Sequence, residues 1–410
     1  MSLAPVFRDT STILSSNQIG LAEQVANGMW RLLVREDKTG GLINGMFLCI
    51  ELPVLTAPYA YVKPNLGYML IDSMSLSVKG VELDRMSGVG MLVKSELSKQ
   101  AAQADGVANM LDGVSVPEVL IERFECTLRD ETAATHWLLH VPLPFWFARS
   151  TVSNPFPLGV LAREDAVLQI TFRSIAEVIV PEPPENTTLT PKMSLVTSNL
   201  YIPPDVSNEL LRSEIDLTKK QLFQQNFYQI ETVDLELPIQ RLEIICNRPV
   251  RRILWTVVGP MMPGSAIMTG AIAVSRLVFD GHDVAATAPK DPNTGLSTDA
   301  FYSEIVQPYL YGSSSGVPGV CSHSFALSTA DRPYMGPKLP LYPFSAKDAD
   351  YGSPYADQPS GAFDLSYTRN FLEVQLNPEV VPEGSSIHVL FETYNVLEYT
   401  LDEMKTLYID

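Results

Sequence analysis

The chain contains 410 residues, of which 46% are hydrophobic and 19% are charged. This composition excludes a mainly disordered protein and is sufficient for two domains with sizeable cores. Its 47 acidic and 29 basic residues give a formal net charge of −18, which repels nucleic acid and anionic membranes and so excludes a function that neutralises phosphates. The four cysteines form no CxxC pair and no zinc spacing, and we predict buried, reduced thiols at Cys49, Cys126, Cys246 and Cys321.

Residues 1–39 mix short apolar and polar pieces, in which residues 21–33 could form a helix. They contain no basic region followed by an apolar core and are therefore not a signal peptide. From residue 40 onward, short alternating apolar segments such as 68–78 and 119–129 are separated by proline and glycine. This rhythm of strand and tight corner predicts an all-β sandwich up to about residue 202.

A corner rich in proline and aromatic residues lies between the strand patterns that end at Val141 and begin at Val167. Its prolines prevent a helix and interrupt any continuous strand ladder. A corner this apolar must be buried, either under its own sheet or against another chain. The aromatic residues in question are Phe145, Trp146, Phe147 and Phe156.

The middle of the chain begins with a polar, proline-rich connection over 181–191, which contains the glycosylation sequon at Asn186. After a further strand near 195–202, Leu211, Ile215 and Leu222 are spaced by four and seven residues. This spacing is typical of a helix, so we predict a helical linker over 203–230 and place the domain boundary there.

The second half repeats the strand-and-corner style of the first half. Residues 253–275 contain no charged residue and approach the length of a membrane-spanning helix, but glycines and prolines interrupt them. Two buried strands joined by a turn are the better prediction. The long loop over 331–357, rich in proline, tyrosine and glycine, is expected to decorate the surface or to contact a neighbour.

Residues that could carry chemistry form no convincing site. His136 and His140 lie on one face of a predicted strand, and His282 lies in a hairpin turn, so neither position predicts a metal site. Nucleotide-binding and zinc-protease motifs are absent. The one basic cluster, Arg248, Arg251 and Arg252, is predicted to be a solvated or salt-bridged strand edge, with a subunit contact as the alternative.

Six stretches, read in chain order, resemble the double jelly-roll major capsid proteins of nucleocytoplasmic large DNA viruses. Their order along the chain is more specific than any one of them. The sequence departs from the family pattern after the Gln-Pro-Ser-Gly signature, where it reads FDLSY, and at Gly90 and Met91, where a tryptophan is usual. The stretches are GGLINGMFLCIELP (40–53), SMSLSVKGVELDRMSGVGMLVKSEL (73–97), LPFWFAR with PLGVLA (143–162), NRPVRRILWTV (247–257), VQPYLYGSSSGVPGVCSHSFAL (306–327) with QPSGAFDLSYTRNFLEVQL (358–376), and YNVLEY (394–399).

The resemblance implies an all-β fold of two consecutive eight-stranded jelly-roll sandwiches, a double jelly roll, with short helical excursions in loops and linker. The expected organisation is an N-terminal arm over 1–39, a first jelly roll over 40–202, a helical linker over 203–230 and a second jelly roll over 231–410.

The resemblance further implies a structural capsid protein of the virion that forms pseudo-hexagonal homotrimeric capsomers tiling an icosahedral shell. Its partners would be further copies of itself, neighbouring capsomers and minor capsid proteins, and assembly is expected in the host cytoplasm. No enzymatic activity, cofactor, metal, direct nucleic-acid contact or membrane insertion is expected. The aromatic corner would contribute to the trimer interface or to core packing.

Two further sets of residues follow from the resemblance. Gln358, Pro359, Ser360 and Gly361 read as a turn that starts the next strand in register, with Gly361 able to take a positive φ. If they are exposed, Asp84 and Arg85 could form a surface pair worth less than about 1 kcal/mol, which would serve orientation rather than stability. The alternatives to a shell subunit are a glycan-processing enzyme on the same double sandwich and a carbohydrate-binding module that uses the loop over 331–357.

Overall fold

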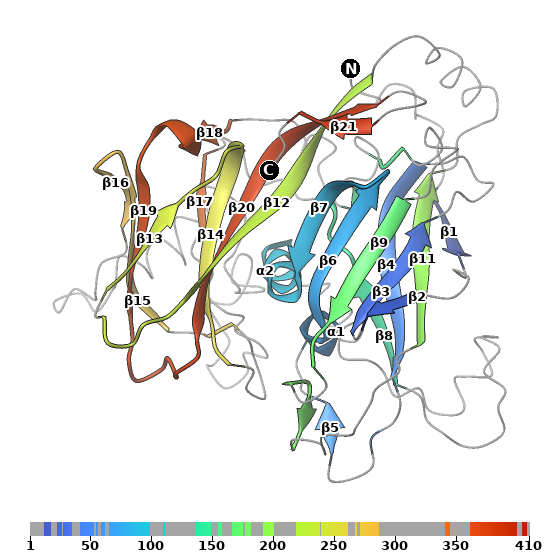
Figure 1. Ribbon diagram of the computed structural model, residues 1–410, viewed down its shortest axis with the longest axis horizontal. Helices are drawn as coiled ribbons and strands as arrows, with labels where there is room; N and C mark the ends of the chain where they lie inside the picture. Colours follow the sequence, from blue (N-terminus) through green and yellow to red (C-terminus); the bar gives the residue numbers. More distant parts are fainter. Residues whose placement is uncertain are drawn as a thin grey trace, which may run out of the picture.

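The computed structural model of the protein describes twenty stretches of the chain, and these are dominated by β-strands (Figure 1). The described residues are 12–17, 23–26, 28–34, 42–52, 55, 59–61, 65–98, 110, 137–148, 155–157, 166–174, 177–181, 192–200, 219–237, 239–260, 267–268, 271–286, 341–344, 361–399 and 404–407.

The first half of the chain folds into a sandwich of two antiparallel sheets. One sheet has the strand order β1-β11-β4-β8 and the other has the order β2-β3-β9-β6-β7. The strands are β1 (Thr12–Asn17), β2 (Glu23–Ala26), β3 (Met29–Val34), β4 (Leu42–Leu52), β6 (Ile71–Val78), β7 (Val81–Ser87), β8 (Trp137–Pro142), β9 (Ala166–Phe172) and β11 (Lys192–Leu200).

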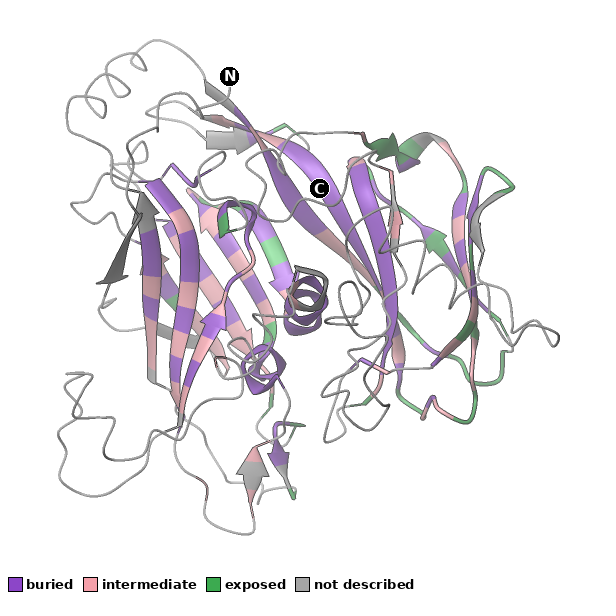
Figure 2. Ribbon diagram, turned by 180° about the vertical axis from the view of Figure 1, so that it is seen from behind, coloured by how far each residue is buried: buried purple, intermediate pink, exposed green. Residues whose placement is uncertain are grey.

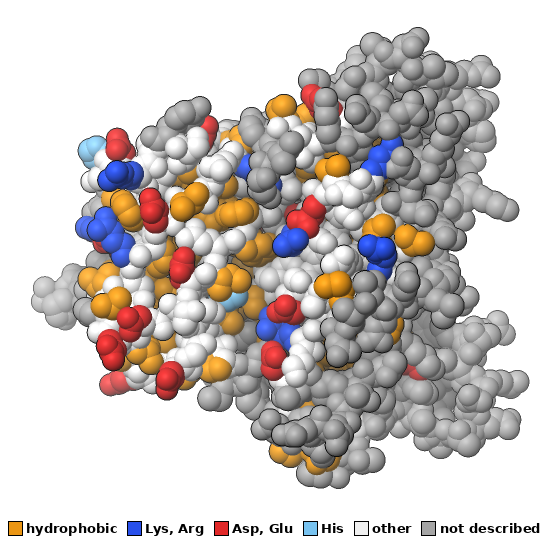
Figure 3. Space-filling model, in the orientation of Figure 1, with side chains coloured by type: hydrophobic (Ala, Val, Ile, Leu, Met, Phe, Trp, Pro, Cys, Tyr) orange, Lys and Arg blue, Asp and Glu red, His pale blue; other side chains and the backbone are white. Residues whose placement is uncertain are grey.

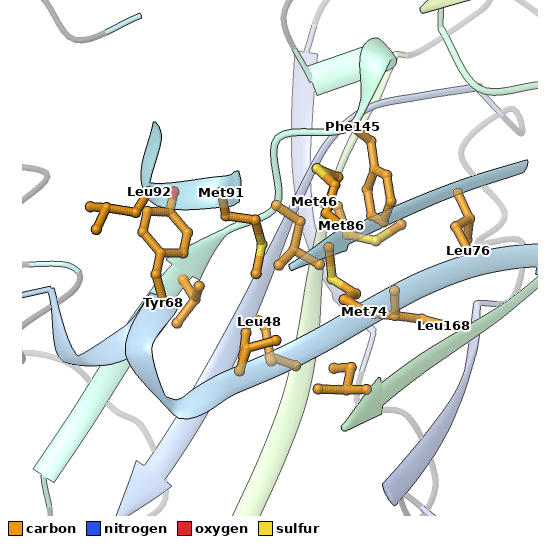
Figure 4. Packing of buried hydrophobic residues seen from close by; sticks show 14 of the residues in the cluster. Met46, Leu48, Tyr68, Met74, Leu76, Met86, Met91, Leu92, Phe145 and Leu168 are labelled. Carbon is orange, nitrogen blue, oxygen red and sulfur yellow. The ribbon is translucent and has the colours of Figure 1, made fainter. Parts of the chain in front are cut away.

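Alternation along these strands sends every second side chain into the core between the sheets. Met46 and Leu48 of β4 point toward Met74 of β6 and Leu168 of β9 (Figure 4), and all four are at most 1% exposed. The same alternation appears as buried and half-buried bands along the strands in Figure 2. Burial of these apolar side chains is the main stabilising term for the sandwich.

The second half forms a second sandwich with the sheet orders β12-β20-β14-β17 and β13-β19-β15-β16. The short strand β18 (Phe363–Asp364) also pairs with β14, and β21 (Met404–Thr406) pairs with β20. The main strands are β12 (Lys219–Thr232), β13 (Gln240–Ile244), β14 (Pro249–Val258), β15 (Ile272–Phe279), β16 (His282–Ala286), β17 (Leu341–Pro343), β19 (Asn370–Leu376) and β20 (Ser386–Tyr399).

Both sandwiches wind in the same order. If the eight main strands of each are numbered along the chain, leaving out the additional strand β2, both sandwiches have one sheet of order 1-8-3-6 and one of order 2-7-4-5. This is the winding of a jelly roll. The predicted pair of eight-stranded jelly rolls is therefore confirmed, although no residue-level repeat is visible in the sequence.

The remaining described elements are short. A small two-stranded sheet joins β5 (Ala60–Tyr61) to β10 (Ile179–Val180). The helices are α1 (Leu66–Leu70), α2 (Gly88–Ser98) and two single 3-10 turns, η2 (Trp146–Ala148) and η8 (Leu365–Tyr367). Among the described helices, none is long and apolar enough to cross a membrane. Of the uncharged stretch, residues 253–258 lie in β14 and residues 272–275 lie in β15, whereas 261–266 and 269–270 lie outside the described residues.

Two expectations about local structure were wrong. A helix was considered over residues 21–33, but residues 23–26 and 29–34 form strands of the first sandwich. An N-terminal arm was expected over 1–39, but β1 also pairs with β11, so the described part of these residues belongs to the sandwich. Residues 219–230 form most of β12, where a helical linker was expected. The helix was predicted from the spacing of only three apolar residues, whereas β12 is held as a strand by fourteen residue pairs with β20.

Candidate functional site: the seam between the sandwiches

The two sandwiches meet along a seam at which β7 and α2 of the first lie against the sheet β12-β20-β14 of the second (Figures 1 and 2). The apolar part of this seam is continuous with the first core. Leu254 and Leu390, from β14 and β20, belong to the same buried cluster as Val89 of α2. A cavity of about 10 Å³ at this contact has room for about one water molecule. The seam is therefore an apolar contact that extends the first core to the second sandwich.

Two glycines allow α2 to approach its neighbours closely. A Cβ at Gly88 would lie 2.1 Å from the carbonyl oxygen of Ile71, and a Cβ at Gly90 would lie 2.2 Å from the hydroxyl of Tyr228 on β12. Ser87 begins the helix, because its Oγ accepts a 3.0 Å hydrogen bond from the backbone N–H of Gly90. The absence of a side chain at Gly90 thus permits the contact with the second sandwich.

Asp84 connects the two sandwiches through hydrogen bonds rather than through a salt bridge. It is 0% exposed, and its Oδ1 accepts from the backbone N–H and from Nδ2 of Asn226, both at 3.0 Å. Its Oδ2 accepts from the same Nδ2 at 2.9 Å. Asn226 lies on β12, a strand at the edge of its sheet. The carboxylate therefore satisfies a backbone donor that a neighbouring strand would otherwise bind.

The expected surface pair of Asp84 with Arg85 was wrong. Adjacent residues of a strand point to opposite faces, so Asp84 enters the seam while Arg85 faces the solvent. There the Arg85 guanidinium pairs with Glu82 at 2.7 Å, and the two side chains are 65% and 39% exposed. Within this motif, Asp84 is the residue with a structural role, and it binds Asn226, which lies 142 positions further along the chain.

A buried group of charges spans the same seam, centred on Glu392 of β20. Glu392 is 1% exposed and forms an ion pair with Arg252 of β14. Arg251 lies 3.9 Å from the same carboxylate, and Lys94 of α2 also approaches it to 3.9 Å from the first sandwich. A register shift between Val250 and Arg252 explains how two consecutive arginines reach one carboxylate.

This finding corrects the prediction of a solvated strand edge for the basic cluster. Arg248, Arg251 and Arg252 are 4%, 5% and 0% exposed. They are salt-bridged in part, as expected, but inside the molecule, so they offer no surface to another subunit. Two arginines of a charged run that is typical of a surface in the sequence here share the carboxylate of Glu392, which lies 140 residues from Arg252.

His388 faces the seam from β20 and lines the small cavity there. Its Nε2 lies 2.9 Å from Ser386 Oγ. Burial, together with the positive charge of Arg173 from the first sandwich, lowers the pKa of His388 to about 4. The imidazole is therefore neutral at neutral pH, and protonation would place a further cation close to Arg173.

The aromatic corner lies in the core. Phe145, Trp146, Phe147 and Phe156 are at most 2% exposed. The ring of Trp146 lies 4.8 Å from the ring of Phe223 on β12, so the corner also anchors the second sandwich. Of the two alternatives, core packing holds, and these side chains have no accessible surface for a trimer contact.

Other predicted positions contribute less. Gly361 has a φ of 154°, whereas Gln358, Pro359, Ser360 and Asn186 lie outside the described residues, as do His136, Cys126, Cys321 and the loop over 331–340 and 345–357. Cys246 is buried and Cys49 is half-buried, and neither forms a disulfide. In the described part of the chain, no group of three or more His, Cys, Asp or Glu side chains could hold a metal ion.

Comparison with known proteins agrees with this architecture. Residues 15–202 match the family described as the major capsid protein N-terminus. The chain is similar to the major capsid protein of Pyramimonas orientalis virus, with 22% identity over 377 residues that cover 88% of this chain and 82% of that protein. In sequence and in fold, the chain is similar to the double jelly-roll major capsid proteins of large DNA viruses.

Other capsid proteins are similar over different shares of their length. Probable capsid protein 4 of Acanthamoeba polyphaga mimivirus is 28% identical over 153 residues, which are 34% of this chain and only 27% of that protein. The crystal structure of PBCV-1 VP54 superimposes with a TM-score of 0.69 at 16% identity, covering 98% of both chains. The Faustovirus major capsid protein gives 0.61 at 9% identity, covering 95% of this chain and 90% of that one. These structures share the fold.

Proposed function

We propose that this chain is the structural subunit of an icosahedral viral capsid and that it acts by self-association rather than by catalysis. The observation that carries the proposal is the buried seam, which joins two sandwiches of the same winding into one block. Apolar packing, the Asp84–Asn226 hydrogen bonds and the Glu392 charge group all cross it. A block of fixed shape is what a tiling subunit requires, and the similarity to major capsid proteins supports the same role.

Three such blocks, related by a threefold axis through a head-to-tail contact, would present six similar sandwiches. The outline of this homotrimer is pseudo-hexagonal and can tile a flat facet. A permanent trimer contact of this kind should bury more than about 2,000 Å² of surface. Since the aromatic corner is buried within the chain, other residues must supply that contact.

The partners of the trimer would be neighbouring capsomers and minor capsid proteins, within the virion. The net charge of −18 is consistent with a shell that does not adhere to packaged nucleic acid. Assembly would take place in the host cytoplasm.

Size-exclusion chromatography with light scattering tests the trimer on the full chain. The expected mass is three times the chain mass of 45.2 kDa, and electron micrographs of that fraction should show near-hexagonal particles. A strictly monomeric protein at micromolar concentration would contradict the proposal.

A further inference from the structure

The seam within the chain joins a hairpin of one sandwich to a sheet of the other. The first sandwich supplies the hairpin of β6 and β7, which leads into α2, and the second supplies the outer face of the sheet β12-β20-β14-β17. On that face Leu254 pairs with Leu390, and both side chains lie against α2 and are at most 4% exposed. A seam of this kind therefore needs a hairpin side and an apolar sheet face.

The second sandwich contains a counterpart of the hairpin that forms the seam. The β6–β7 hairpin turns through Lys79 and Gly80, and the β15–β16 hairpin turns through Asp280 and Gly281, all four with positive φ. Both hairpins then shift register after the second residue pair from the turn. Strands β7 and β16 are also the terminal strands of their sheets. Because a bulge sets the bend and twist of its strand, β16 presents its free edge as β7 does.

The first sandwich contains a counterpart of the sheet face that receives the hairpin. In both sandwiches, the pairing of the third strand with the eighth skips one residue of the third strand. Three residues beyond the skipped one, the third strand places Phe47 opposite Val196 in the first sandwich and Leu254 opposite Leu390 in the second. The shared bulge thus assigns the same position in the two sheets to these two apolar pairs.

Phe47 and Val196 point away from the core of their sandwich. Each alternates with buried neighbours along its strand. Pro142 of β8 pairs with Phe47 on its other side and extends the same row. We name Phe47, Val196 and Pro142 the outer row. Its three residues are uncharged and half-buried, whereas the matching pair Leu254 and Leu390 is buried in the seam.

The β15–β16 hairpin and the outer row lie at opposite ends of the molecule. In Figure 1 the hairpin is at the left end, and the sheet that contains β4 and β11 is at the right, on the side away from the second sandwich. These two parts of a seam therefore cannot meet within one chain. A neighbouring copy can bring them together, because a contact between two different surfaces is head-to-tail and closes a ring when the rotation permits.

Charge does not select this contact. On the sheet that contains β15, Arg241 and Arg276 both pair with Glu373 of β19, at 3.6 and 2.8 Å, so these charges compensate one another in part. Figure 3 shows acidic and basic side chains interspersed over the second sandwich, at the left. The outer row carries no charge at all. The match rests instead on the shared hairpin, the shared bulge and the apolar row.

We propose that the β15–β16 side of the second sandwich packs on the outer row of a second copy of this chain, so that a seam of the same kind joins copies head to tail. This inference rests on the proposed capsid function and assigns surfaces to its self-association. Counted from the hairpin turn, the position of Asp84 is taken by Ala285. The contact between copies therefore lacks the buried carboxylate of the seam and depends on apolar packing.

Phe47→Ser removes the centre of the outer row and tests the contact on the full-length chain. Analytical ultracentrifugation should show an association constant at least about tenfold below that of the parent, as for loss of a binding hot spot. Leu33→Ser is the matched control. Leu33 is also half-buried and points outward, but it lies on β3, in the sheet that supplies the seam within the chain. It should associate as the parent does.

The two variants also control for stability. Both remove a half-buried apolar side chain from the outer face of a sheet, so their melting midpoints should fall by similar amounts, and association is compared well below both midpoints. Association of Phe47→Ser equal to that of Leu33→Ser would overturn the contact and leave the capsid function intact. A parent chain that never associates would overturn both.

The native thiol of Cys49 gives a measurement that needs no substitution. Cys49 is half-buried and lies two residues beyond Phe47 on the same face of β4. Its labelling by maleimide, followed by mass spectrometry of the peptide that contains it, should be slower in the assembled chain than in the dissociated chain. Equal labelling in both states would place this sheet face outside any contact between copies.

Discussion

Replacing Asp84 by alanine should destabilise the seam more than any exposed substitution. The change removes the three hydrogen bonds that the carboxylate accepts from Asn226, of 3.0, 3.0 and 2.9 Å, and a fourth from the N–H of Arg85 at 3.0 Å, and it leaves two donors of Asn226 without their acceptor. Asn226 is only 6% exposed, so water cannot readily replace the carboxylate.

Each hydrogen bond to a charged group contributes about 1.5–3 kcal/mol. The cost of burying the carboxylate offsets several kcal/mol of that total. The two orphaned donors of Asn226 add about 1–3 kcal/mol each to the loss. Together these terms predict that Asp84→Ala lowers the free energy of unfolding by about 3–5 kcal/mol, the range found when one partner of a buried charged contact is removed.

Urea unfolding followed by tryptophan fluorescence measures this change. Arg85→Ala is the matched control, because Arg85 is the next residue and its pair with Glu82 is exposed. The control should cost less than about 1 kcal/mol. If Asp84→Ala cost no more than Arg85→Ala, the role of the Asp84–Asn226 contact in holding the sandwiches together would be refuted.

An exchange of the two side chains tests the contact more directly. Asn226→Asp alone places two carboxylates opposite each other and should be strongly destabilising. The double variant Asp84→Asn/Asn226→Asp restores one amide facing one carboxylate, and it should recover at least about 1 kcal/mol relative to the sum of the single variants. Strict additivity would show that the two side chains do not interact.

Three further predictions concern packing and pH. Gly88→Ala should lower the free energy of unfolding by about 2–4 kcal/mol, because its Cβ would lie 2.1 Å from the carbonyl oxygen of Ile71. Thermal melting measures this change. Gly45→Ala is the control and should lower it less, because the atom nearest to its Cβ would be 3.1 Å away. Because the unfolded state binds a proton at His388 more readily than the folded state, the free energy of unfolding should fall by about 3 kcal/mol as the pH drops from about 6.5 to 4. His388→Gln should reduce this dependence of the free energy of unfolding on pH, as measured by urea unfolding at several pH values. An unchanged pH dependence in the variant would contradict the prediction. Trp146→Ala should reduce stability by about 3–5 kcal/mol, and a loss of association without a change in melting would show that the ring serves an interface.

The sequence predicted the class of fold because its signals are local. Proline and glycine corners between alternating apolar segments indicate sandwiches whatever the distant contacts are, and the apolar corner around Trp146 had to be buried. The resemblance to a capsid family then supplied the number of sandwiches. Boundaries were less accurate, since β12 is rich in glutamine and takes its strand conformation from pairing with β20.

The seam could not be predicted in this way because its contacts join residues far apart in the chain. Nothing near Asp84 indicates Asn226, and nothing near Arg252 indicates Glu392. Charged residues are read as surface by default, since they are seldom buried without a partner. The one available signal was the spacing of arginines within an otherwise apolar strand, a pattern that favours buried pairing over a solvated edge.

The shared winding order of the two sandwiches has a consequence for how such a chain can diversify. The connection between the fifth and sixth strands is long in both halves, from β7 to β8 and from β16 to β17. Because the two sandwiches wind in the same order, these two long connections leave them at corresponding ends. Sequence changes and insertions can therefore accumulate at that end in both halves without altering the two cores or the seam between the sandwiches.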